Sequence, residues 1–235
     1  MSNRNNYLCV RLPEELVAAL ADTAAAIAEA AKGDEDDGDG ATGFEPMAPD
    51  GVHLTFCFLG PHAQRLKRDA AFHGALRGAL VGDAPPAAAS VDGARGRAAA
   101  ASPPPPLPAL AAPFACRPTR LLTFPPGKHN LLVAAFDELP AGVAARAGAA
   151  HAVAARLVHP SLAALNSPDW FPHVTLGKIR GPAAAHGRVV DAAAAVWGAQ
   201  AAAGWPAVPC DGRLVLRGHA LAQAPDVPWD DAPLL

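Results

Sequence analysis

The chain has 235 residues and a formal net charge of −3, which is enough length for one sizeable core or for two small lobes that share one. The slightly acidic balance excludes a broad basic surface for double-stranded nucleic acid. No stretch reaches the roughly 18 strongly apolar residues of a membrane span, so no membrane partner is expected.

The first expected elements are a strand followed by a helix. Residues 7–12 (YLCVRL) alternate apolar and polar side chains, which predicts a half-buried strand. A proline and two acidic residues then begin a helix over residues 13–32, where apolar residues recur with helical spacing. The acidic, glycine-containing segment that follows predicts a solvated loop over residues 33–50.

The middle of the chain contains a second strand and a long insert. Residues 53–59 predict a strand that ends at a Gly-Pro pair, and residues 63–80 have the pattern of an amphipathic helix with basic residues on its outer face. Residues 82–112 are rich in alanine, proline and glycine, which predicts an extended insert without a packed core.

Regular structure is expected to resume with a hairpin. Strands over 114–124 and 130–136 flank a Pro-Pro-Gly-Lys turn. The later elements are a helix over 139–158, a strand over 173–179, a weak alanine helix within 181–203, a strand over 213–218 and an irregular tail over 223–235. This order predicts an α+β fold with mixed sheets and outer helices, in a single domain over residues 1–222.

A His-x-Thr motif lies in the strand GVHLTFCFLG, which begins at residue 51. Successive side chains of a strand point to opposite faces, so His53, Thr55 and Cys57 are expected to share one face. The apolar residues between them, together with Phe58, are expected to face the core. One such motif alone is more typical of a structural histidine than of a catalytic site.

The second copy, in FPHVTLGKI, places His173 and Thr175 in the same arrangement, 120 residues further on. Two histidines at one cleft can act as base and acid, since the imidazole titrates near pH 6.5. Phosphodiester cleavage needs such a pair, and the threonine hydroxyls can donate to the phosphoryl oxygens. This scheme requires no metal, and no carboxylate cluster suggests one, so no cofactor is expected.

The pair HLTFCFLG and HVTLGKI resembles the signature motifs of the two-histidine (2H) phosphoesterase superfamily, which includes LigT-like 2′-5′ RNA ligases and cyclic nucleotide phosphodiesterases. The opening NYLCVRLPEEL is similar to that family's first strand and helix. FPPGKHNLLVAAF and the N-terminal Asn-Tyr resemble the branch that contains the central domain of A-kinase anchoring proteins. The resemblance covers most of residues 6–218. The acidic loop, the insert and the tail depart from the family pattern.

The resemblance implies a bilobal α+β fold with pseudo-twofold symmetry, in which each lobe places one motif on a central strand facing a groove. It implies that His53 and His173 are the acid and base, and that Thr55 and Thr175 bind phosphate. Which histidine is the base stays open.

Five further side chains are candidates for substrate contact. Tyr7 and Arg11 lie on the polar face of the first strand, although an exposed sheet edge is the alternative for Arg11. Trp170 and Phe171 can stack on a nucleobase or pack in the core. Lys128 can reach a phosphate or remain a solvated turn lysine. The other histidines have no matched partner and are expected to be surface or incidental residues: His62, His73, His129, His151, His159, His186 and His219.

The leading hypothesis is a monomeric, metal-independent phosphodiesterase. Its substrates would be cyclic (2′,3′- or 1″,2″-type) or 2′-5′-linked phosphodiesters of nucleotides or short RNA ends. The alternatives are a nucleotide- or RNA-end-binding module with little turnover, and a 2′-5′ RNA ligase that runs the reverse reaction.

The four cysteines are widely scattered and form no C-x-x-C pair, so neither a zinc site nor a disulfide framework is predicted. Reduced thiols suit a cytoplasmic or nuclear protein. The polar opening of the chain is not typical of a secretory signal.

Overall fold

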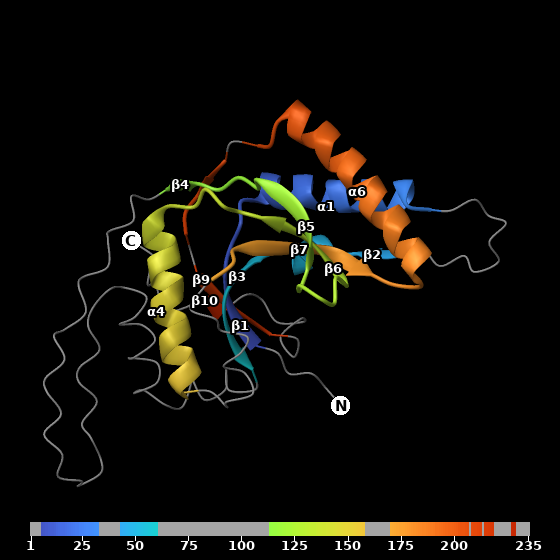
Figure 1. Cartoon of the computed structure of the whole chain (residues 1–235). Helices are drawn as coiled ribbons and strands as arrows, with labels where there is room; N and C mark the ends of the chain where they lie inside the picture. The colour runs from blue at the N-terminus through green and yellow to red at the C-terminus, as the bar shows by residue number, and fades with distance from the viewer. Residues whose placement is uncertain are drawn as a thin grey trace, which may run out of the picture.

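The computed structural model describes residues 6–32, 43–60, 113–157, 170–206, 208–212, 214–218 and 227–228 (Figure 1). The elements are, in chain order, β1 (Asn6–Val10), α1 (Glu14–Ala30), β2 (Phe44–Pro46), the 3-10 helix η2 (Pro49–Gly51), β3 (Leu54–Gly60), β4 (Phe114–Ala115), β5 (Arg120–Phe124), β6 (Leu131–Ala135), α4 (Ala141–Leu157), β7 (His173–Ile179), α6 (Ala183–Ala203), β8 (Pro209–Cys210), β9 (Leu214–Gly218) and β10 (Val227–Pro228). The helix expected over 63–80 and the insert over 82–112 lie outside the described residues.

Two four-stranded antiparallel sheets organise the described chain, one in the order β10-β9-β1-β3 and the other in the order β2-β7-β6-β5. Each sheet carries one His-x-Thr strand, so the expected α+β class and two-lobed arrangement are confirmed. Strand β7 lies inside its sheet, whereas β3 is the edge of the other sheet as far as the described strands go. Strand β2 precedes the first motif in sequence but pairs with the strand of the second.

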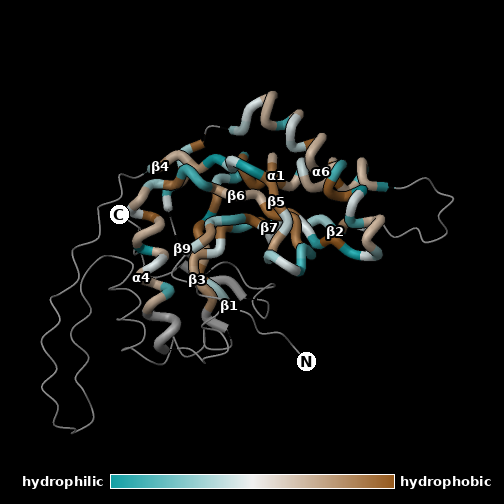
Figure 2. The backbone as a smooth tube through the Cα atoms, in the orientation of Figure 1, coloured by the Kyte–Doolittle hydropathy of each residue, from teal (hydrophilic) through white to brown (hydrophobic). Residues whose placement is uncertain are grey.

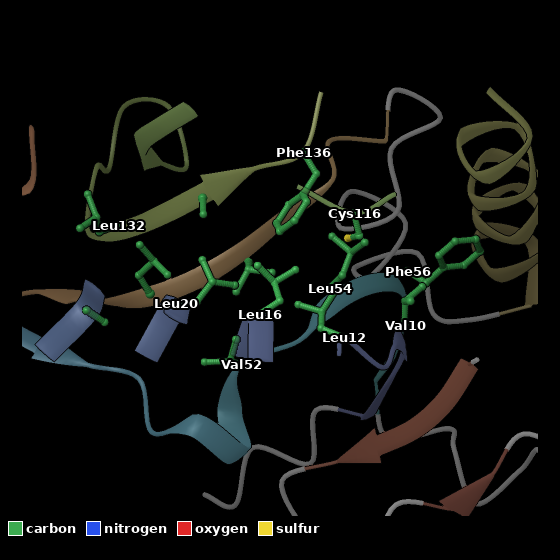
Figure 3. Close-up of a cluster of buried hydrophobic side chains, with 14 of the residues drawn as sticks. Val10, Leu12, Leu16, Leu20, Val52, Leu54, Phe56, Cys116, Leu132 and Phe136 are labelled. Atoms are coloured by element: carbon green, nitrogen blue, oxygen red, sulfur yellow. The ribbon is translucent and has the colours of Figure 1, made fainter. Parts of the chain in front are cut away.

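A single hydrophobic core joins the two halves. Helix α1 begins after Pro13 with two glutamates in its first turn, and its buried residues recur with helical spacing. They pack in one cluster with side chains from both sheets, and Figure 3 shows Leu16 and Leu20 of α1 in the same cluster as Leu54 and Phe136. Figure 2 shows hydrophobic residues gathered where α1 lies beside the central strands, with α6 packed on α1.

Several short strands were not expected from the sequence. The predicted strand over 114–124 is divided around Pro118 into β4 and β5. The end of the predicted acidic loop forms β2, which fully buries Phe44, while residues 33–42 lie outside the described residues. In the predicted irregular tail, β10 pairs with β9.

All four cysteines are buried free thiols. Burial raises the pKa of the Cys57 thiol to about 12. Cys116 and Cys210 come together where β4 pairs with β8, and their mutual hydrogen bond raises the pKa of Cys116 and lowers the pKa of Cys210.

Both motif strands carry a β-bulge one residue after the threonine. The register of β1 with β3 moves from Leu8 opposite Cys57 to Cys9 opposite Thr55, which leaves Phe56 as the extra residue. The register of β6 with β7 shifts in the same way and leaves Leu176 extra. The two motifs therefore share a backbone irregularity as well as a sequence.

The bulge corrects the predicted position of Cys57. Alternation placed this residue on the face of His53 and Thr55, but Phe56 and Cys57 are both buried, and Phe58 returns to the half-buried side. The prediction was wrong because the extra residue of a bulge reverses the alternation that follows it.

The approach of β2 to β7 requires a glycine. A Cβ at Gly177 would lie 2.3 Å from Cζ of Phe44 and 2.5 Å from the carbonyl oxygen of Glu45. We predict that Gly177→Ala lowers the free energy of unfolding by about 1–3 kcal/mol through overpacking. The exposed Gly198 of α6 has no atom within 4 Å of its virtual Cβ, so Gly198→Ala should raise that free energy by about 0.5–1 kcal/mol. Urea denaturation of both variants measures whether their free energies of unfolding change in opposite directions. An equal change in the two variants would contradict the packing argument.

Candidate active site

His53 lies directly before β3, with its imidazole ring stacked on Tyr7. The two ring centroids are 4.4 Å apart and the rings are inclined by 13°. Phe58 is also near Tyr7, with ring centroids 5.9 Å apart, because the bulge turned it to this face. Ring stacking restrains the plane of the imidazole. Tyr7, a predicted substrate contact, therefore lies directly beside the first histidine.

His173 begins β7 and is held by its own segment. Its Nδ1 atom lies 2.8 Å from the carbonyl oxygen of Phe171. A carbonyl only accepts hydrogen bonds, so Nδ1 carries the proton in the neutral imidazole, and Nε2 is the nitrogen that can take a proton from a reactant. The rings of Phe171 and Phe124 contact the imidazole at centroid distances of 5.2 and 4.7 Å, and they are stacked on each other at 5.7 Å.

The surroundings of His173 shift its titration. Desolvation by burial lowers the pKa of His173 below its ordinary value of 6.5, and the hydrogen bond to the Phe171 carbonyl opposes this shift. The imidazole is therefore neutral at pH 7. A neutral histidine with a protonated Nδ1 is suited to act as a general base.

An exposed ion pair lies beside Phe171, the ring that stacks on His173. Nε of Arg120 donates to Oδ2 of Asp137 at 2.6 Å, and the Arg120 guanidinium lies 5.8 Å from the ring centroid of Phe171. The same guanidinium lowers the pKa of Asp137. The chain of contacts runs from Asp137 through Arg120 and Phe171 to His173, and it restrains the ring that stacks on the histidine.

Hydrogen bonds from the second half of the chain reach the first motif strand. Nε1 of Trp170 donates to the carbonyl oxygen of Thr55 at 3.1 Å, and the indole lies 5.2 Å from the ring of Phe56. Nε2 of His151, on α4, is hydrogen-bonded to the carbonyl oxygen of Phe56. Strands β3 and β7 also contact one another directly. The two motifs, far apart in sequence, are thus brought together.

The surface position expected for His151 is wrong. Its side chain is 5% exposed, because α4 packs against β3. His129, by contrast, is exposed in the hairpin turn, where its Nδ1 lies 2.8 Å from Oγ1 of Thr123.

The other predicted site residues differ in exposure. Arg11 is exposed, with its Nη2 atom 3.8 Å from Oε1 of Glu14, and it shares with His53 the wall of a hollow of about 380 Å³. Lys128 is exposed in the turn between β5 and β6. Thr55 and Thr175 are half-buried on their strands.

The sequence did not predict that Phe124 contacts His173 or that His151 binds the Phe56 carbonyl. Phe124 is an aromatic residue at a strand end before a proline, but only the folding of the hairpin against β7 brings it to His173. The signal for His151 was equally weak, since a histidine in an alanine-rich helix carries no sign of its partner.

No group of three His, Cys, Asp or Glu side chains in the described ranges is placed to hold a metal ion. None of the helices within those ranges has the length and apolar character needed to cross a membrane.

No family model and no curated protein matches the chain. Two solved structures are similar in fold. The protein TT0787 of Thermus thermophilus has 21% sequence identity and a TM-score of 0.48, with 90% of this chain and 87% of that chain covered. E. coli LigT complexed with 3′-AMP has 14% identity and a TM-score of 0.44, with 92% of this chain and 88% of that chain covered.

The lowered pKa of His173 predicts a measurable pH dependence. NMR titration of its imidazole should give an apparent pKa below 6.5 in the folded protein and near 6.5 in the urea-unfolded chain. The unfolded chain then binds the proton more readily, so this residue makes the protein less stable as pH falls from about 6.5 toward the folded pKa. A folded value at or above the unfolded one would contradict the burial argument.

Proposed function

We propose that the chain is a phosphodiesterase in which His53 and His173 perform acid–base catalysis on one phosphate. The observation that carries the proposal is the pair of His-x-Thr motifs on bulged strands that contact each other. The match of sequence, bulge position and burial between the two motifs supports a pair of equivalent catalytic groups more than two structural histidines.

In this proposal His173 is the base. Its neutral imidazole takes a proton from the attacking water or hydroxyl at Nε2, while His53 delivers a proton to the leaving oxygen. The hydroxyls of Thr55 and Thr175 donate to the nonbridging phosphoryl oxygens, where negative charge grows in the transition state. Hydrolysis consumes one water and produces a phosphomonoester and an alcohol, and this scheme requires no metal.

The proposed substrates are cyclic (2′,3′- or 1″,2″-type) or 2′-5′-linked phosphodiesters of nucleotides or short RNA ends. Aromatic rings border both histidines, which favours substrates with bases that can stack. Tyr7 provides such a ring beside His53, and Phe124 and Phe171 provide it beside His173. The hollow beside His53 would accept the adjoining sugar, with Arg11 at its wall. Lys128 remains a candidate phosphate contact.

We predict that His53→Ala and His173→Ala each lower kcat by roughly 10²–10⁴-fold, because each removes one proton transfer. Both variants should keep the circular dichroism spectrum of the wild type. The assay is turnover of 2′,3′-cyclic nucleotides and 2′-5′ oligoadenylates with EDTA and no added metal. His186→Ala, in α6, is the matched control and should turn over normally.

Three results of that assay decide between the hypotheses. Full activity in either active-site variant would overturn the assignment. Binding of nucleotides without product in the wild type would favour a nucleotide-binding module. Joining of cleaved RNA ends, seen by product analysis, would favour the ligase direction.

The dependence of kcat/KM on pH should be bell-shaped, with two apparent pKa values that belong to the coupled pair. The acidic limb reports the base, and the burial of His173 should place that limb below pH 6.5. Initial rates between pH 4 and 10 measure the profile. A rate that rises across the whole range without a basic limb would be inconsistent with a histidine acid.

A further inference from the structure

We propose that Trp170 and His151 are positioning residues, which hold the bulge of β3 at a fixed place relative to the second motif by binding the carbonyls of Thr55 and Phe56. This inference rests on the proposed function, since it assigns these side chains a part in aligning the two motifs for one phosphate.

The bulge creates the need for these bonds. Phe56 is the extra residue of β3, so the backbone around it leaves the regular ladder with β1. Buried carbonyl groups require hydrogen-bond donors, and here the donors come from side chains. The indole N–H of Trp170 reaches the Thr55 carbonyl at 3.1 Å, and His151 Nε2 reaches the Phe56 carbonyl.

The second motif is held in a corresponding way from the first half of the chain. Leu176 is the extra residue of β7, and its carbonyl oxygen accepts a hydrogen bond from the backbone N–H of Met47 at 2.7 Å. Met47 lies between β2 and β3, in the segment that leads to His53. His151 and Trp170 lie in the segment that leads to His173. Each bulge is therefore bound by the segment that enters the other motif.

Burial makes the two side chains suited to this task. His151 is 5% exposed, and Trp170 is half-buried with its indole against the ring of Phe56. Hydrogen bonds in such surroundings are strong because water does not compete for them. A carbonyl accepts only, so Nε2 of His151 carries a proton in this arrangement.

The effect on the reaction follows from the position of the backbone carbonyl that Trp170 binds. The Thr55 carbonyl belongs to the residue whose hydroxyl is proposed to bind the phosphate. Release of that carbonyl lets the residue rotate, and a displacement of about 1 Å at a reacting group can cost about 10²-fold in rate. The loss of rate should appear in kcat more than in KM, because the hydrogen bond aligns the Thr55 hydroxyl with the phosphate and does not itself bind substrate.

The test compares variants that differ in one donor. Trp170→Phe keeps an aromatic ring and removes the N–H, and kcat should fall by about 10- to 100-fold with KM within about twofold. Trp197→Phe, in α6, is the matched control and should keep the wild-type kcat. His151→Gln retains an N–H donor and should stay near wild type, whereas His151→Leu should lose activity as Trp170→Phe does. Circular dichroism confirms that each variant is folded at the assay temperature.

A second readout does not depend on turnover. Titration of inorganic phosphate is followed by the imidazole NMR signals of His53 and His173. In the wild type, both signals should move with one shared dissociation constant for phosphate. Trp170→Phe should raise that dissociation constant or give the two histidine signals different ones. Shared movement in a wild type that has no turnover would remove the proposed catalysis and leave the positioning inference standing. Turnover and phosphate response in Trp170→Phe equal to those of Trp197→Phe would overturn the inference and leave the proposed function intact.

Discussion

Each His-x-Thr motif is followed by one residue outside the strand ladder, and the surroundings of both histidines depend on that residue. The bulge leaves the histidine and threonine half-buried, then turns the next two residues into the core: Phe56 and Cys57 in β3, and their counterparts in β7. In β3 it also returns Phe58 to the side of Tyr7. A straight strand would have left a thiol beside His53 and an aromatic ring in the core.

The two motifs share a backbone plan, but their histidines have different neighbours. His53 is stacked on the ring of Tyr7. His173 is hydrogen-bonded through Nδ1 and contacts the rings of Phe124 and Phe171, and burial lowers its pKa. The proposed function needs two residues of one type in unlike protonation states, and unlike surroundings are the means by which a protein separates such states.

Elements with a clear periodicity were predictable, and long-range partners were not. The alternation in residues 7–12 and the spacing in α1 gave β1 and α1 nearly at their bounds. The two-residue strands β4 and β8 are too short to show a period, and nothing local marks their pairing. The face of Cys57 was predicted wrongly because a bulge leaves no trace in the alternation itself. His151 was misplaced because its partner is a backbone carbonyl 95 positions away. The substrate contacts of Arg11 and Lys128 stay predictions.

Strand β2 also determines what one edge of the second sheet offers to another strand. It covers one edge of the second sheet with three residues, and the last of them, Pro46, has no N–H to offer. Its middle residue, Glu45, is exposed and paired with Arg180. A short edge that ends in proline and carries charge is a poor template for another strand. The strand that packs over Gly177 therefore also makes this edge of the sheet unsuited to edge-to-edge pairing.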